Sequence, residues 1–281
     1  MIRRKDIKAY LLIAPAVTIA VLFSIYPFIK SLIDSFLTVS QSGRILGFAG
    51  LDNYKMLFRD EAFHNSLRNT ALFAIIFVPL NTVLTLSAAA LTRNKRRFSS
   101  ISETIFFLPM SLSLAASSMI FKEMFRGRIS IVNRIFGTSI EWLSEGLPAL
   151  LVLVFLGVFL DFGLDYILLL SAFRSNDKSV TEAAMLDGAG SMRLLFEIEL
   201  PMIRKMLLAT VFLAAKDALL IVAPIMIVTE GGPFRATETL MYYYYLEAFR
   251  SGNRGIQNTL SVILVLGASL FMALSGKRRK R

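Results

Sequence analysis

Residues 180–201 read VTEAAMLDGAGSMRLLFEIELP, a polar stretch with many small residues that lies between two long apolar runs. Ser179 and Glu182 have the spacing of a capping box, which predicts that a helix begins near Val180. Gly188 can adopt the positive φ that ends a helix in a sharp turn. A short helix and a turn are therefore expected here.

A second helix is expected after the turn. Ser191 can cap it, and Leu194, Leu195 and Ile198 recur at helical spacing. Pro201 is compatible only with the first turn of the helix that follows. The stretch thus predicts two helices joined by an elbow, and its small side chains would let another protein surface approach the backbone. Taken one by one, the same residues also fit a helix that caps itself and contains good helix formers.

The composition indicates a membrane protein. The chain has 281 residues, of which 55% are hydrophobic, and its mean hydropathy is +0.62. It has no cysteine and one histidine, which excludes disulfides, thiolate metal sites and histidine pairs for catalysis. The net charge of +11 comes from short basic clusters beside apolar runs, so it indicates membrane topology and not binding of nucleic acid.

The apolar runs predict an all-α membrane protein with six transmembrane helices. Each run is long enough to cross a bilayer core, and Pro109 is expected to kink the third one. The first run continues through bulky residues without a cleavage site, so it is expected to be a retained anchor and not a signal peptide. The predicted spans cover residues 9–29, 69–92, 104–121, 148–172, 206–228 and 257–275.

Charge asymmetry predicts the orientation. Residues 1–8, 92–100, 173–205 and 276–281 together carry 18 Lys and Arg, against 10 in the three loops of the opposite side, at 38–66, 122–147 and 229–257. By the positive-inside tendency, both termini and the elbow are expected in the cytoplasm.

The predicted domain organisation has three parts. The first, at 1–66, holds a cytoplasmic stub, the first span and an external loop. A transmembrane domain follows at 67–275 with a cytoplasmic coupling segment at 174–205, and the basic tail occupies 276–281.

Four charged residues lie inside predicted spans: Asp161, Asp165, Lys216 and Asp217. Each costs roughly 2.5–3.5 kcal/mol on insertion scales unless water, a partner or a ligand compensates it. Lys216 is expected to pair with Asp161 or Asp165 across the subunit interior. Alternatively, the four line a substrate passage or form salt bridges to a sister subunit.

The elbow carries a family motif. Glu-Ala-Ala, three residues, Gly, nine residues, Ile, one residue and Leu-Pro resembles the cytoplasmic motif of permease subunits in binding-protein-dependent ABC importers. The resemblance implies the type I importer fold and docking of a separate ATPase through the 180–200 segment. Carried over by position, the ATPase-coupling residues are Glu182, Ala183, Ala184, Asp187, Gly188 and Ala189.

Residues 229–249 extend the resemblance toward carbohydrate importers. Thr229–Pro233 and Thr239–Tyr245 look like the external loop before the last span in the first permease of maltose-type and glycerol-phosphate-type transporters. The resemblance implies import of a sugar or sugar-like solute across a bacterial plasma membrane. It also implies a second homologous permease, two ATPase subunits, an extracytoplasmic solute-binding protein and surrounding lipid as partners. Tyr242–Tyr245 fit an aromatic belt at the membrane interface or, alternatively, a contact to the binding protein.

The sequence holds no phosphate loop of the Gly-x-x-x-x-Gly-Lys-Ser/Thr type. We therefore expect no enzymatic activity and no cofactor on this chain, with ATP and Mg on the partner ATPases. One departure from the family is the absence of a proline in residues 173–177, before the elbow.

Two rival interpretations use the intramembrane charges. An ion-coupled secondary transporter would use Asp161, Asp165 and Lys216 as an ion relay, and an intramembrane enzyme would use Asp161 and Asp165 as a carboxylate pair. The first lacks an internal repeat, and the second gives the elbow no role.

Overall fold

The structure of the chain, a computed structural model, describes the backbone of residues 4–40, 42–94 and 99–277, and the side chains of 12–40, 42–94, 100–250 and 252–269. The described chain is mostly helical, as predicted, and forms two compact units. One unit comes from residues 1–64 and 243–281, and the other from 65–242. The predicted basic clusters at 95–97 and 278–281 lie outside the described residues.

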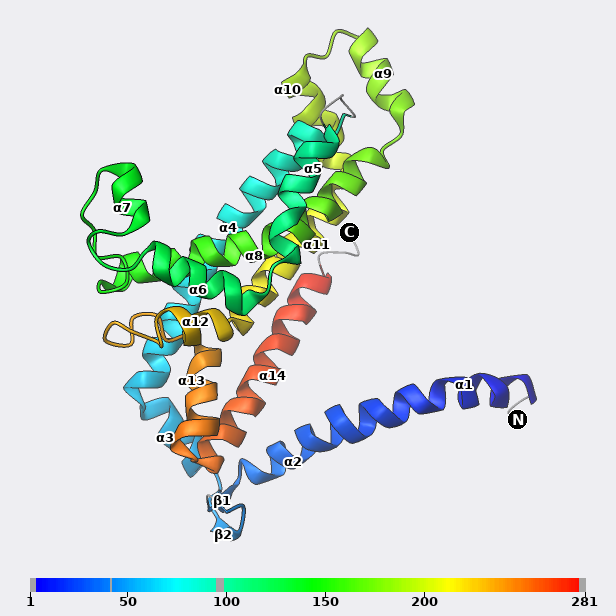
Figure 1. Cartoon of the computed structure of the whole chain (residues 1–281). Helices are drawn as coiled ribbons and strands as arrows, with labels where there is room; N and C mark the ends of the chain where they lie inside the picture. Colours follow the sequence, from blue (N-terminus) through cyan, green and yellow to red (C-terminus); the bar gives the residue numbers. More distant parts are fainter. Residues whose placement is uncertain (1–3, 41, 95–98, 278–281) are drawn as a thin grey trace. The chain divides into compact units, whose positions relative to one another are not determined.

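The first unit is built around two helical runs that pack on each other, α2 and α14. The run from α1 to α2 is a continuous helix with one π-helical stretch, η1 (Figure 1). The elements of this unit are α1 (Arg4–Ala20), η1 (Val21–Ile25), α2 (Tyr26–Asp34), β1 (Leu37–Val39), β2 (Ile45–Phe48), α3 (Asp52–Arg59), α13 (Leu240–Leu246), η4 (Glu247–Ser251) and α14 (Arg254–Lys277), where α13 begins at the unit boundary.

A small antiparallel hairpin follows α2, and the sequence did not predict it. Gly43 takes a φ of 84° in its turn, and β1 pairs with β2. Asn53 on α3 donates hydrogen bonds from Nδ2 to the carbonyls of Ser35 and Leu37, at 2.8 and 3.1 Å. These bonds hold the start of the hairpin against α3, so the predicted external loop is an ordered structure.

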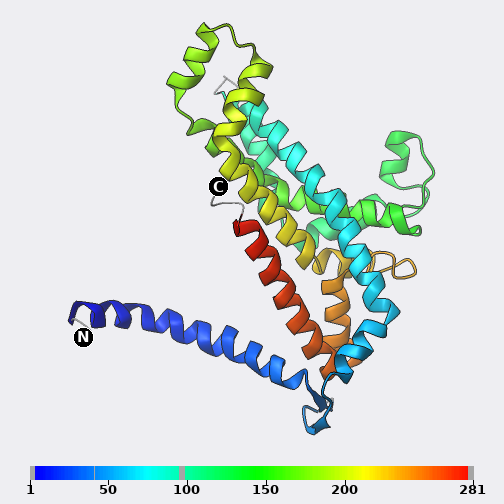
Figure 2. The ribbon, with the colours of Figure 1, turned by 180° about the vertical axis from the view of Figure 1, so that it is seen from behind.

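The second unit is a bundle in which α4, α5, α8 and α11 lie side by side (Figures 1 and 2). α4 begins in the last residues of the first unit and continues through this one. The elements are α4 (Glu61–Thr92), α5 (Ser99–Phe107), η2 (Leu108–Ser111), α6 (Leu114–Met124), α7 (Ile131–Phe136), α8 (Gly146–Arg174), α9 (Lys178–Leu186), α10 (Ser191–Arg193), η3 (Leu194–Glu199), α11 (Leu200–Leu220) and α12 (Ala223–Val228).

Small residues allow the helices of this bundle to approach each other. Ala88–Ala90 of α4 pack with Tyr166 and Leu169 of α8, and all of them are buried. The Tyr166 hydroxyl shares a 2.8 Å hydrogen bond with that of Thr92. Close contact through alanines is a common way for apolar helices to associate where no water drives them together.

The predicted kink at Pro109 is confirmed. α5 ends at Phe107, the chain makes a 3₁₀ turn through Pro109, and α6 leaves at 97° to the preceding helix. Proline has no N–H for the ladder, so the helix cannot pass through it unchanged.

The prediction of one continuous span at 206–228 is wrong. α11 begins earlier, at Leu200, and ends at Leu220, where Ile221 turns to extended backbone with ψ of 120°. Pro224 in the first turn of α12 cannot donate to the preceding turn. Thr239 compensates by donating its hydroxyl to the Ile221 carbonyl at 3.1 Å.

Three described helical segments are long and apolar enough to cross a membrane, and a fourth is added if the bent pair at Pro109 forms one span. They are Leu12–Asp34, Glu61–Thr92, Gly146–Arg174 and the pair Ser100–Ser111 with Leu114–Met124. These helical segments overlap the predicted spans 9–29, 69–92, 104–121 and 148–172, whose boundaries in the membrane stay predictions. α11 carries four charges, and the side chains at the end of α14 lie outside the description.

Candidate functional site

The elbow begins with a helix cap that differs from the predicted one. Asp177 caps α9, and its Oδ1 accepts the backbone N–H of Ser179 at 2.9 Å. The helix therefore starts at Lys178, and the predicted capping box of Ser179 and Glu182 is wrong. Hydrogen bonds from the Ser179 N–H and hydroxyl lower the pKa of Asp177, which keeps the cap ionised. An Asp cap at this place also makes up for the missing proline in residues 173–177.

The turn after α9 is the predicted one. Gly188 has a φ of 84°, its N–H bonds to Met185 O, and the N–H of Ala189 bonds to Ala184 O, both at 3.0 Å. This pair of bonds is a Schellman motif, which satisfies carbonyls at the helix end. A side chain at this φ is strained, so glycine is required here by the backbone.

The second arm of the elbow is longer than predicted. The backbone is helical without a break from α10 through η3 to the end of α11. Gly190 is the cap, and Ser191 is the first helical residue and not the cap. The π turns of η3 end just before Pro201, which sits in the first turn of α11 as expected. Wider turns let a helix run into a proline that cannot donate a hydrogen bond.

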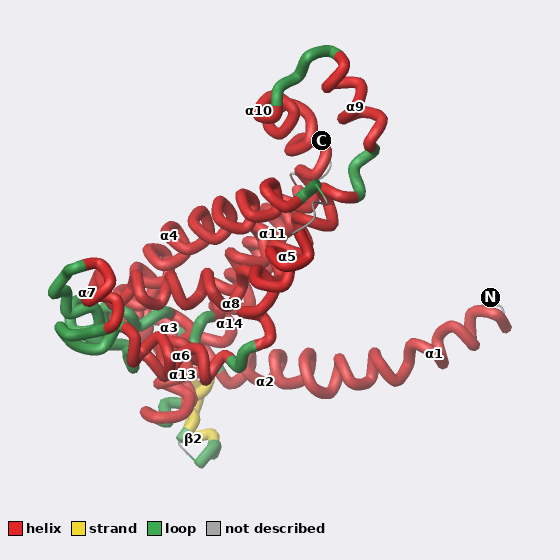
Figure 3. The backbone as a smooth tube through the Cα atoms, turned by 45° about the horizontal axis from the view of Figure 1, so that its top comes forward, coloured by secondary structure: helices red, strands yellow, loops and turns green. Residues whose placement is uncertain are grey.

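Figure 3 shows the elbow as two helical arms, α9 and α10, joined by a loop. Apolar and small side chains are exposed at its tip. Leu186 is 89% exposed and Met192 is 73% exposed, with Met185 and Phe196 also exposed. Of the predicted coupling residues, Glu182, Ala183, Asp187 and Gly188 are exposed, and Ala184 and Ala189 are partly buried. Exposed apolar side chains gathered at one tip are typical of a surface that binds another protein.

Two ion pairs fix the base of the elbow to the bundle, and the sequence did not predict them. Arg93 at the end of α4 approaches Glu199 of η3 to 2.9 Å, with both side chains largely buried. Arg174 at the end of α8 approaches Glu103 of α5 to 2.6 Å and donates to the Thr92 carbonyl. The two arginines had been counted only as positive charges for topology. Their partners lie 106 and 71 positions away in the chain, so no local pattern in the sequence indicated the pairs.

The intramembrane charges are partnered differently from the prediction. Lys216 pairs with its neighbour Asp217 at 2.5 Å. Asp165 is buried and accepts a 2.6 Å hydrogen bond from Asn81 Nδ2 on α4. Pairing of Lys216 with Asp161 or Asp165 is therefore wrong within the described residues. Asn81 lies in an apolar run, and no sequence pattern singled it out.

A cavity of about 340 Å³ lies in the same unit and receives two of these carboxylates. Asp161 on α8 and Asp217 on α11 line it, together with the stacked rings of Phe73 and Phe77 on α4. The break after α11 forms part of its wall through Ile221. An open cavity with aromatic faces and carboxylate oxygens can hold a solute that carries hydroxyl groups.

Tyr242 and Tyr243 do not form a belt at the membrane interface. Both are buried, and the Tyr243 hydroxyl donates to Asp60 at 2.6 Å. Tyr244 and Tyr245 are partly buried, and the Tyr245 ring packs on Phe249. The aromatic run therefore packs mostly within the chain.

Known proteins resemble the chain in fold and in sequence, although no family model matches it. A crystal structure of a bacterial alginate ABC transporter in complex with an alginate pentasaccharide-bound periplasmic protein contains a chain with a TM-score of 0.87, at 16% identity over 99% of this chain and 96% of that one. The lactose transport system permease protein LacF of Rhizobium radiobacter is 32% identical over 274 residues, which are 94% of this chain and 91% of the relative. The chain belongs to the family of ABC transporter permease proteins.

A second relative of this permease supports the assignment. The sn-glycerol-3-phosphate transport system permease protein UgpA of Escherichia coli O6:K15:H31 is 30% identical over 279 residues, 96% of this chain and 95% of the relative. The permease is thus a membrane protein without ATP hydrolysis of its own, which in this family occurs on separate subunits. The family assignment decides against both the ion-coupled transporter and the intramembrane enzyme.

Proposed function

We propose that this permease imports a sugar or sugar-like solute and that a separate ATPase subunit docks on its elbow. The observation that carries the proposal is the exposed apolar tip of α9 and α10, held on a rigid Schellman turn. An ATPase that grips this tip could move the base of the elbow as one body, because the Arg93–Glu199 and Arg174–Glu103 ion pairs link it to three bundle helices. The coupling residues are those named from the motif.

The solute passage in this proposal includes the cavity beside Asp161 and Asp217. Support comes from its chemistry, since aromatic rings can stack on a sugar ring while carboxylates accept hydrogen bonds from hydroxyl groups. The names of the relatives also support a solute of this kind, because LacF belongs to a lactose system and UgpA to a glycerol-phosphate system. Lys216 would hold Asp217 in place through their ion pair.

The complete importer in this proposal has a second permease, two ATPase subunits that bind ATP and Mg, and a solute-binding protein outside the cell. The permease would cross a bacterial plasma membrane six times, with both termini and the elbow in the cytoplasm. The broken α11–α12 run and α14 would then supply the two spans beyond the four that length and composition support. The excess of Lys and Arg on the elbow side supports the orientation.

The decisive experiment compares two glycines with the same backbone geometry. Gly188 follows α9 and Gly137 follows α7, both have positive φ, and no atom of the chain lies within 4 Å of a Cβ placed at either. We expect Gly188→Arg to abolish solute-stimulated ATP hydrolysis and retention of the ATPase by the purified complex. Gly137→Arg introduces the same strain and charge, and we expect it to retain the ATPase.

Equal retention of the ATPase and equal coupling in both variants would refute docking at the elbow. Equal loss in both would show that the effect comes from backbone strain alone. Uptake against a concentration gradient by the permease reconstituted without any ATPase would refute the proposal that ATP hydrolysis drives import.

A further inference from the structure

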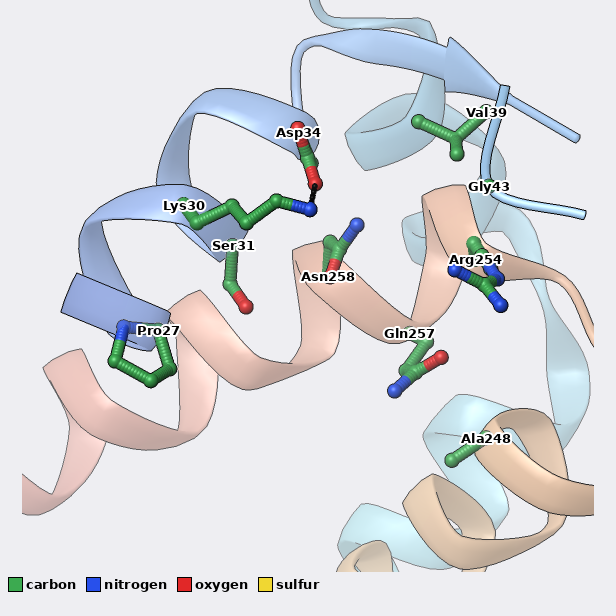
Figure 4. Close-up of a pocket in the computed structure, with 10 residues that line it drawn as sticks. All are labelled: Pro27, Lys30, Ser31, Asp34, Val39, Gly43, Ala248, Arg254, Gln257 and Asn258. Atoms are coloured by element: carbon green, nitrogen blue, oxygen red, sulfur yellow. Dashed lines mark ion pairs between the residues drawn. The ribbon is translucent and has the colours of Figure 1, made fainter. Parts of the chain in front are cut away.

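A polar pocket of about 390 Å³ lies within the first unit (Figure 4). α2 contributes Lys30, Ser31 and Asp34 to it, and the first turns of α14 contribute Arg254 and Asn258. In Figure 4 the side chains of the two helices face the same space. With Gln257, the two packed helices therefore place six polar side chains around one hollow.

The pocket has an unbalanced positive charge. Lys30 lies 3.5 Å from Asp34, so this pair is neutral as a whole. Arg254 has no ion-pair partner among the residues that the structure describes. Its guanidinium lies over Gly43, with a nitrogen 2.7 Å from where a Cβ would stand, so a side chain at position 43 would require the guanidinium to shift. The guanidinium of Arg254 is thus free to bind an anion.

The side chains around Arg254 suit an oxyanion. A guanidinium binds phosphate through two parallel N–H donors, and the Lys30 ammonium and the Asn258 amide supply further donors at the same hollow. Gln257 adds another amide at its edge. A carboxylate-rich wall would oppose an anion, but Asp34 is the one acid among the residues that line the pocket.

The position of the pocket at the end of a candidate membrane span indicates which molecule supplies the anion. Lys30 and Asp34 lie in the last turn and a half of Leu12–Asp34, a segment long and apolar enough to cross a membrane. The apolar side chains of that segment are exposed, including Phe23 and Ile33. A basic pocket at the end of such a helix lies at the depth of lipid headgroups.

We propose that this pocket binds a phosphate-bearing anion and that the anion is the headgroup of an anionic phospholipid. Arg254 holds the phosphate oxygens, with Lys30 and Asn258 as further donors. The site requires only that Leu12–Asp34 cross a membrane, so it stands or falls separately from the transport proposal.

The test uses the full permease with the subunits that co-purify with it, in nanodiscs of phosphatidylcholine with or without phosphatidylglycerol. After mild extraction, native mass spectrometry measures how much phosphatidylglycerol each complex retains. We expect Lys30→Gln with Arg254→Gln to weaken this retention about tenfold. Arg254→Lys keeps the charge and should retain most of it, which separates loss of binding from loss of folding.

The matched control is Lys55→Gln with Arg59→Gln, which removes the same charge from exposed residues on α3 of the same unit. The control should retain the lipid as the unaltered chain does. Calorimetric titration of the complex in pure phosphatidylcholine with inorganic phosphate tests the other source. Phosphate binding that the pocket variant loses would support the anion site but overturn the lipid assignment. Equal lipid retention by all variants, without phosphate binding, would overturn the proposal altogether.

Discussion

Two short helices of the second unit end alike but are held in place differently. α7 and α9 each have a side-chain cap at the start, Ser130 and Asp177, and a positive-φ glycine at the end. Both also expose apolar residues, such as Phe136 on α7 and Leu186 on α9. α7 belongs to a loop that is held together by the hydrogen bonds of one of its own side chains, Asn133, which we call the staple. The Asn133 side chain donates to two backbone carbonyls and accepts from Thr138 and Trp142.

α9 has no such staple. Among the described residues, the side-chain hydrogen bonds of α9 are local ones at its own first turn. The ion pairs that hold the elbow lie at its base, between Arg93 and Glu199 and between Arg174 and Glu103. A loop whose polar groups bond to one another can keep its conformation without a partner. A tip whose ion pairs lie only at its base leaves its exposed side chains available to a partner protein. The difference supports the proposal that the elbow, and not the α7 loop, is the docking surface.

The largest effect on stability should come from removing the ion pair at the base of the elbow. Glu199→Ala leaves Arg93 buried without its partner, which should reduce the free energy of unfolding by about 3 kcal/mol. Denaturant unfolding of the purified permease measures the loss. Glu197→Ala removes an equally charged residue that pairs with exposed Arg193, and it should leave the unfolding midpoint unchanged. Similar midpoints for the two variants would show that the base does not depend on this pair.

Cutting the staple of the α7 loop should have the next largest effect. Asn133→Ala removes four hydrogen bonds from a buried side chain and leaves the Trp142 indole N–H unpaired, so we expect a loss of about 2 kcal/mol. Thr138→Val removes only one of the bonds and should cost about 1 kcal/mol. Trp142 fluorescence during unfolding reports on this loop directly, and an unshifted curve for Asn133→Ala would contradict the role of the staple.

Charging the exposed tips should separate docking from stability. Leu186→Asp and Phe136→Asp each place a carboxylate at a highly exposed site, so both should change stability by less than about 0.5 kcal/mol. Only the first should release the ATPase subunit on size-exclusion chromatography, because only α9 is expected to dock. Release by both, or by Phe136→Asp alone, would reverse the comparison.

The smallest expected effect is that of low pH on the Asp177 cap of α9. The pKa of Asp177 is lowered below 3.8 by its bonds from Ser179, so the ionised cap stabilises α9 above that value and is lost as the pH falls through the lowered pKa. Hydrogen exchange at the Ser179 amide should therefore stay protected at neutral pH and lose protection only in strong acid. Asp177→Asn keeps a cap without a titrating group, and an acid transition that persists in this variant would assign it to another residue.

Sequence reasoning succeeded where a local rule decides the structure. The Gly188 turn and the Pro109 bend each follow from the chemistry of a single residue, and hydrophobic length predicted the long helices α4 and α8. The break at Ile221 was missed although Pro224 was a visible signal, because the residues on both sides of the break, from Ala218 to Val228, are apolar. Local pattern also misplaced the cap of α9, since Ser179 and Asp177 both fit and only the folded backbone chooses between them.

Pairings between distant residues could not be predicted in the same way. Lys216 was assigned to Asp161 or Asp165 by charge alone, yet side-chain reach favoured its neighbour Asp217, and Asp165 found a neutral partner in Asn81, 84 positions earlier in the chain. The motif located the elbow, but nothing local in the sequence connected Arg93 with Glu199. Which helix ends meet is a property of the bundle, not of any one segment.

The unbroken helix from Ser191 to Leu220 connects the elbow to the wall of the cavity. At 1.5 Å per residue this rod is about 45 Å long, comparable to the full thickness of a bilayer. A rod of that length converts a tilt of about 5° at one end into a displacement of about 4 Å at the other. The rod has the geometry of a lever arm, so a small tilt at its elbow end would be enough to shift Asp217 by more than the length of a hydrogen bond.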